Sequence, residues 1–179
     1  VTEQEFADDR TFTLRVLSDH TIGSGIFRTA FTWAATRHIE QIDPSESLSA
    51  FRQQLFSLGA EVELPVAESG SGFWSRANLS AGVSFDGAST PETGGRPSRN
   101  PINDWGARVG GSAWLGDATR LHVGMSRKVR FPSLRELYSG ALGRFVPNPD
   151  LKPEVLGALE AGLTGTGVGL GGRLEAQAV

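Results

Sequence analysis

Few residues in this sequence have the types and spacing that catalysis or metal binding requires. Glu61 and Glu63 could form a carboxylate dyad, but two positions apart on one strand they share a face. On that face they more simply line a wet channel, opposite a basic neighbour such as Arg76. The chain holds three histidines, none at the i, i+4 spacing of a zinc-binding helix: His20, His38 and His122.

A glycine pattern near the end of the chain, Gly167-x-Gly169-x-x-Gly172, formally matches a dinucleotide-binding fingerprint. No helical pattern follows it, so we interpret it as a tight turn between two strands. Cysteine is absent, which removes disulfides and thiolate metal sites. We therefore predict neither enzyme activity nor a bound cofactor or metal.

Overall charge and hydropathy exclude two further classes of protein. The formal net charge is −3, and no basic stripe with interleaved aromatic residues is present, so a nucleic-acid partner is not predicted. No apolar run approaches the roughly 18 residues of a transmembrane helix. A membrane assignment must therefore rest on the alternation of side chains along strands.

The segment from Arg127 to Glu154 is basic within an acidic chain, with six Lys or Arg against three Asp or Glu. Such a segment attracts anionic ligands, for example iron chelates, or binds lipid phosphates. An ordinary solvated loop is the simpler alternative, and we weight it more heavily. The candidate anionic-ligand contacts are Arg127, Lys128, Arg135 and Arg144.

These residues lie between segments that alternate apolar and polar side chains. From 56 to 64, Phe56, Leu58 and Leu64 fall on one face and Glu61 and Glu63 on the other. The segments are long enough to cross a bilayer on a tilt, which takes roughly 9–11 residues. The predicted strands are 11–19, 26–38, 51–66, 73–86, 104–115, 118–128, 154–165 and 170–179. Aromatic residues expected on the lipid face are Phe12, Phe27, Phe31, Trp33, Phe73, Phe85 and Trp105.

The predicted connections are alternately short and long, as in outer-membrane barrels with short periplasmic turns and long extracellular loops. The long segments are 39–50, 87–103 and 129–153. We therefore predict an all-β fold: an antiparallel, up-and-down transmembrane β-barrel segment of about eight strands. Two alternatives remain open, a complete small barrel of eight strands and a soluble ligand-binding barrel or sandwich whose apolar face is its core.

The longest connection carries three ordered motifs, of the forms Arg-x-Pro-Ser-x-x-Glu-Leu-Tyr, Asn-Pro-x-Leu-x-Pro-Glu and Glu-x-Gly. Their residues are Arg130, Pro132, Ser133, Leu134, Glu136, Leu137, Tyr138, Asn148, Pro149, Leu151, Pro153, Glu154, Glu160 and Gly162. This part of the chain resembles the barrel of the TonB-dependent outer-membrane receptors, most closely over 104–179. Phe131 departs from the alanine that the family commonly has there.

The first motif also predicts a short helix in this long extracellular loop. Pro132 suits a first helical position, and Ser133 with Glu136 three residues later forms a capping box. Leu134, Leu137 and Tyr138 then lie on one side of the helix. We expect a loop scaffold rather than direct ligand contact.

The resemblance implies a bacterial outer-membrane location and a plugged barrel of about 22 strands. It implies uptake of scarce ligands, chiefly siderophore-bound iron and vitamin B12, with energy passed through TonB. Partners would be membrane lipids, a plug domain, TonB and a small-molecule ligand. The sequence begins at Val1 without a leader and stops within an alternating pattern, so we expect 1–179 to be part of such a barrel, with the plug and remaining strands outside it.

Overall fold

The structure is a computed structural model that describes residues 6–41, 47–67, 74–116, 119–138, 148–169 and 172–178. Within them lie eight strands and one short helix. The strands are β1 (Phe6–Ile22), β2 (Gly25–Gln41), β3 (Ser49–Ala67), β4 (Trp74–Thr93), β5 (Ile102–Leu115), β6 (Thr119–Arg130), β7 (Glu154–Gly169) and β8 (Gly172–Ala178). The helix, α1, spans Leu134–Tyr138.

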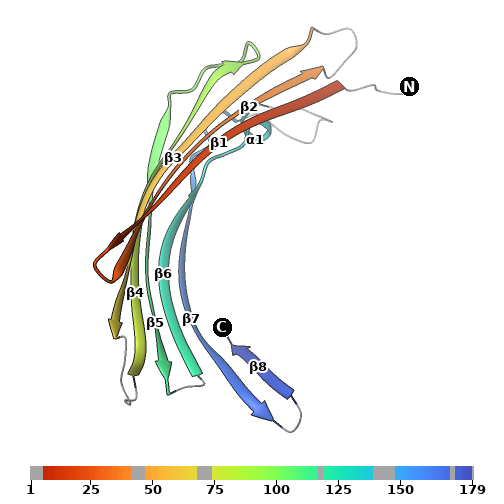
Figure 1. The fold of residues 1–179 in the computed structure, drawn as a ribbon. Helices are drawn as coiled ribbons and strands as arrows, with labels where there is room; N and C mark the ends of the chain where they lie inside the picture. The colour runs from red at the N-terminus through yellow and green to blue at the C-terminus, as the bar shows by residue number, and fades with distance from the viewer. Residues whose placement is uncertain are drawn as a thin grey trace.

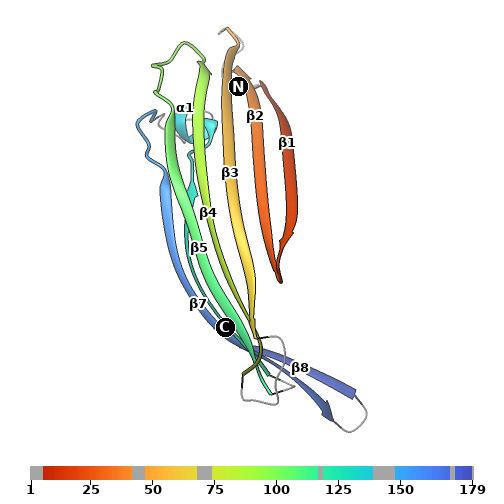
Figure 2. The same cartoon turned by 60° about the vertical axis from the view of Figure 1, so that its left-hand side comes forward.

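All eight strands form one antiparallel sheet in chain order, β1 to β8. The sheet bends into a trough, with α1 on its concave side, and Figure 2 shows β1 to β5 side by side in chain order (Figures 1 and 2). The predicted all-β, up-and-down architecture is confirmed. In the described residues β1 pairs with β2 and β8 with β7, so the sheet is an open wall and not the closed eight-stranded barrel of one alternative.

The strands are longer than predicted at the end where α1 lies. β4 continues to Thr93 and β5 starts at Ile102, so the expected connection 87–103 shrinks to 94–101. Pairing holds this extension together, because Phe51 of β3 faces Thr93 of β4 in register. Backbone pairing thus continues past the length that a bilayer needs. Chain connections at this end, 42–48, 94–101 and 131–153, remain longer than those at the other, 23–24, 68–73, 116–118 and 170–171.

A β-bulge explains where the alternation of β4 breaks. The register between β4 and β5 shifts between Ser75 and Ala77. Arg76, the extra residue, has a φ of 53°, in the left-handed region that non-glycine residues rarely occupy. Beyond the bulge the alternation resumes, so Ala77 and Leu79 lie on the same face as Phe85.

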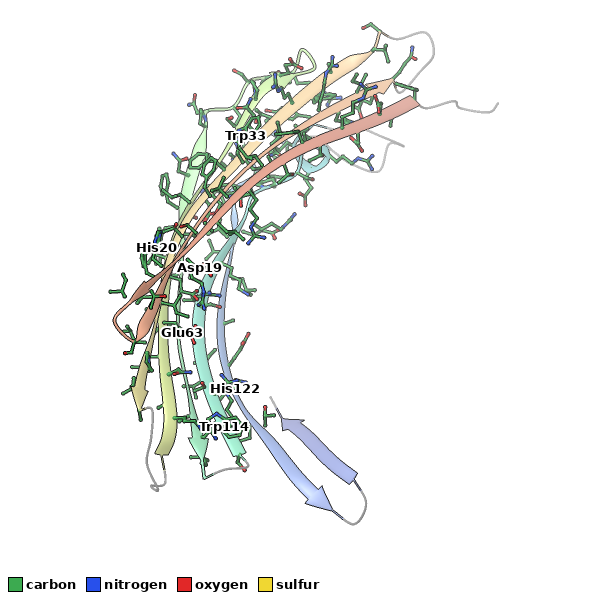
Figure 3. All side chains as sticks on the ribbon, viewed as in Figure 1. Asp19, His20, Trp33, Glu63, Trp114 and His122 are labelled. Carbon is green, nitrogen blue, oxygen red and sulfur yellow. The ribbon has the colours of Figure 1, made fainter. Side chains whose placement is uncertain are left out.

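The two faces of the sheet differ in composition. The convex face carries the apolar set, and it is open: Leu58 is 56% exposed, Leu79 55% and Val123 51%. The concave face carries the polar set, and Figure 3 shows the consecutive residues Asp19 and His20 on opposite sides of the ribbon (Figure 3). A soluble sandwich would cover its apolar face. Nothing in the described part of the chain covers this one.

The expected lipid-face aromatic residues follow this division. Register pairs Trp105 with Phe85 and Leu58 with Phe31 on the convex face, and Phe12 packs 6.0 Å from Trp33 between ring centroids. Phe73 lies outside the described residues. No helix among the described residues is long and apolar enough to cross a membrane.

Candidate functional site

One arginine ties together the two ends of the long connection between β6 and β7. Arg130 is the last residue of β6 and lies in register with Glu154, the first residue of β7. Its Nε and Nη2 donate to Glu154 at 2.8 and 2.9 Å, while Nη1 and Nη2 donate to Glu136 of α1 at 3.1 and 2.9 Å. The planar guanidinium suits such two-sided binding of carboxylates. We call Arg130, Glu136 and Glu154 the latch.

The predicted capping box forms at the start of α1. The Glu136 backbone N–H donates to the Ser133 hydroxyl at 3.3 Å, and the Ser133 backbone N–H donates to the Glu136 carboxylate at 2.8 Å. The hydrogen bonds from Arg130, and then that from the Ser133 backbone, lower the pKa of Glu136 to about 2. The prediction that Pro132 is the first helical residue is wrong. The helix begins at Leu134, so Ser133 is its N-cap residue and Pro132 lies before the cap.

The apolar side of α1 packs on the concave face of the sheet, as expected from its spacing. Leu134, Leu137 and Tyr138 are buried against Phe51 of β3, with Leu151 partly buried beside them. The rings of Phe51 and Tyr138 stack with centroids 5.9 Å apart. The carbonyl of Pro132 accepts a hydrogen bond from Gln53 Nε2 at 2.7 Å. Residues 132–138 of this connection therefore lie inside the trough.

A chain of polar contacts extends this docking to β1 and β2. Arg135 of α1 pairs with Asp9 Oδ2 at 3.0 Å, and Asp9 Oδ1 lies 2.5 Å from Nδ1 of His38. His38 Nε2 lies 3.2 Å from Glu40 Oε2, and both His38 and Glu40 are buried. Sequence reasoning missed this group because its members come from distant parts of the chain. No pattern in the local sequence indicates this group.

The remaining motif residues shape the return path into β7. Asn148 starts a turn in which its side chain accepts from the Asp150 N–H at 3.1 Å and its carbonyl from the Leu151 N–H at 3.3 Å. Pro149 lies within this turn, and Pro153 directly precedes β7. Glu160 and Gly162 lie further along β7 on the concave face, where Gly162 is buried opposite His122.

Ion pairs line the middle of the concave face. Arg28 of β2 binds Glu63 at 2.8 Å and Glu61 at 3.3 Å, and Arg108 of β5 binds the other oxygen of Glu61. The prediction that the two glutamates line the wall holds, but their basic partners are Arg28 and Arg108. Arg76 is not among them, because the register places Gly82 and Ser80 of β4 opposite Glu61 and Glu63. The guanidinium of Arg76 instead lies 4.8 Å above the ring of Trp114.

The four candidate anion contacts do not form one cluster. Arg127 lies on the convex face, 4.2 Å above the Trp105 ring and 3.0 Å from Asp104. Lys128 borders a concave hollow of about 400 Å³ that Glu61, Arg108 and Glu160 also line. Arg135 is paired with Asp9. Arg144 lies outside the described residues.

The structure places the weaker chemical candidates as well. β7 ends at Gly169 and β8 begins at Gly172, in register with each other, so the glycine pattern is a strand-to-strand connection as interpreted. His20 contacts Ser18 at 2.8 Å between Nε2 and the hydroxyl. Among the described residues, no group of three or more His, Asp or Glu side chains is placed to hold a metal ion.

Comparison with known proteins identifies the family. The model of the family "TonB dependent receptor-like, beta-barrel" matches residues 3–178, nearly the whole chain. No curated protein and no solved structure matches this chain. The family is one of outer-membrane receptors. The open antiparallel wall, with a bare apolar face and a charged face, has the form that part of such a barrel requires. This chain belongs to the TonB-dependent receptor β-barrel family.

Proposed function

We propose that this wall belongs to a receptor that takes up a scarce, anionic ligand, such as siderophore-bound iron, across the outer membrane. The family match carries this proposal, because its members are receptors and transporters. The wall would enclose a plug domain, and TonB would supply energy through parts of the receptor outside residues 1–179. The convex face would contact lipid.

Two features of the concave face support an anionic ligand. Lys128 and Arg108 border one hollow, which extends from the middle of the wall toward the end with the short connections. Lys128 has no carboxylate partner within the described ranges, whereas Arg108 is paired with Glu61. A lysine ammonium facing a polar hollow is free to pair with a carboxylate, catecholate or hydroxamate oxygen of a chelate. Of the four candidate contacts, Lys128 is the one that we assign to the ligand.

The motif loop would serve as scaffold for this site. The latch fixes the end of β6, two residues beyond Lys128, to the start of β7 and to α1. The packing of α1 on Phe51 anchors residues 134–138 of the loop in the trough. Preorganisation of this kind reduces the entropy lost when a ligand binds.

Growth on single iron chelates tests the function. A strain lacking the full receptor gene should fail to grow on at least one chelate as sole iron source, and the complete gene should restore growth. Lys128→Gln should restore it only at higher chelate concentration, whereas Thr164→Asn, on the concave face of β7, should behave as wild type. If the deletion strain grew as well as the wild type on every chelate and on vitamin B12, the result would oppose the proposal.

A further inference from the structure

Three arginines face one another across neighbouring strands at one edge of the convex face. Arg10 of β1 lies in register with Arg37 of β2, and Arg37 lies in register with Arg52 of β3. Adjacent strands are roughly 4.8 Å apart, so the three side chains start from one compact row. Like charges directly opposite each other destabilise a sheet. An anion that bridges them would remove this cost. We call these residues the arginine row.

The arginine row lies just beyond an aromatic band. One step along the same face, Phe12 faces Ala35, and one step further Trp33 faces Phe56. Leu58 and Phe31 follow in the next row. Aromatic residues mark the level of lipid headgroups in outer-membrane barrels, with aliphatic residues in the hydrocarbon between. The arginines therefore stand at headgroup depth, at the end where the long loops lie.

Carboxylates neutralise the row only in part. Arg10 pairs with Asp8 at 3.1 Å, but in the described ranges neither Arg37 nor Arg52 forms an ion pair. Glu92 of β4 lies in register with Arg52, but the two side chains form no ion pair. A hollow of about 480 Å³ is lined by all three arginines, with Phe12 and Ala35 at its apolar side.

Two arginines elsewhere on the wall have carboxylate partners. Arg28 on the concave face binds two glutamates, and Arg127, which also lies on the convex face, is held by Asp104. The arginine row is thus a distinct concentration of cationic charge on the convex face. Guanidinium groups bind phosphate oxygens two at a time, and basic clusters at membrane surfaces recognise lipid headgroups.

We propose that Arg10, Arg37 and Arg52 bind the phosphorylated headgroup of an outer-leaflet lipid, whose acyl chains run down over Phe12 and Trp33. The site rests on the convex face being the lipid face, not on which ligand the receptor transports. A negative result for lipid binding would therefore not contradict the proposed transport function. A negative growth test would likewise not contradict the proposed lipid site.

Lipid retention by the purified, full-length receptor tests the site. The probes are diphosphoryl lipid A, its dephosphorylated form and inorganic phosphate, each titrated into detergent-solubilised receptor and followed by native mass spectrometry. Arg37→Gln/Arg52→Gln should raise the Kd for diphosphoryl lipid A by about tenfold or more, equivalent to about 1.4 kcal/mol. The matched control, Arg15→Gln/Arg120→Gln, removes the same charge from the concave face and should bind as wild type.

The other probes separate lipid from free phosphate. The dephosphorylated lipid should not be retained, and millimolar inorganic phosphate should not compete, because it lacks the acyl chains. Equal binding by the Gln double variant, or full competition by phosphate, would overturn the proposal. If the Gln double variant does not assemble, the single variants and Arg37→Lys/Arg52→Lys decide: the single variants should bind more weakly than wild type, and the lysine variant should retain binding.

Discussion

The convex and concave faces of this sheet come from the same strands, yet different physical rules govern them. On the convex face, Leu58, Leu79 and Val123 stand open and touch few neighbours, so their placement follows from strand alternation alone. On the concave face, Glu61 is bound by arginines from β2 and β5, and Phe51 is covered by a helix that follows β6. The comparison shows that local sequence determines which residues lie on the convex face. On the concave face, the contacts between residues depend on parts of the chain that are distant in sequence.

The strongest test of this comparison introduces the same charge separately at two consecutive residues of β3. Leu58→Arg puts a charge in hydrocarbon and should destabilise the barrel of the full receptor by about 2–4 kcal/mol. Ser57→Arg puts the same charge on the concave face, opposite Asp86, and should cost little. Urea titration of the heat-modifiable folded band on gels measures both. Equal losses would mean that the two faces are not in different solvents.

Truncating the docked helix tests the concave side. Leu137→Ala removes a fully buried side chain from a small cluster and should weaken docking of α1 by about 2 kcal/mol, the low end of the range for such changes. Limited proteolysis within 131–153 should accelerate accordingly. Leu156→Ala is the control, because Leu156 is exposed on the same face. Unchanged protection in Leu137→Ala would contradict the docking.

Breaking the latch should have a smaller, local effect. Arg130→Met leaves Glu136 and Glu154 facing each other without a cation, so the loop should be cleaved faster while the barrel still assembles. Arg130→Lys keeps the charge but cannot bind both carboxylates through a planar fork, and it should fall between wild type and Arg130→Met. A lysine variant as labile as the methionine variant would assign the effect to geometry rather than charge.

Acid gives the mildest perturbation of the latch. The folded-state pKa of Glu136, about 2, lies below its ordinary value near 4.5, so the carboxylate stabilises the docked loop above pH 4.5. That contribution should decline as the pH falls from about 4.5 to about 2. Hydrogen exchange at 133–138 across this range measures it. Glu136→Gln should show a flatter profile, and an identical profile would remove Glu136 as the titrating group.

Alternation, loop lengths and the capping box were enough to predict the eight strands, their order, the helix and the buried side of α1. Each of these features depends on residues a few positions apart. The Arg76 bulge was visible only as a break in the pattern, since sequence gives no φ angle. The extension of β4 to Thr93 depends on pairing with Phe51, some forty positions away.

The contacts of the candidate site depend on register and were not predictable. Arg130, Glu136 and Glu154 were recognised as motif residues, but their joining requires β6 and β7 to pair from Arg130 and Glu154 downward. Arg135 and Asp9 are 126 positions apart in sequence. The partners of Glu61 have the same cause, because register places Arg28 of β2 opposite Glu61 and Arg108 of β5 one strand beyond it, and leaves Arg76 further along β4.

The central claim is that lipid contacts the convex face and water the concave one. Single cysteines introduced at positions 56–63 of the full receptor, in a segment with no native cysteine, can carry nitroxide labels in the outer membrane. The account predicts that labels at 56, 58, 60 and 62 collide preferentially with oxygen, and those at 57, 59, 61 and 63 with a water-soluble nickel chelate. Absence of this alternation, or its reversal, would contradict the account.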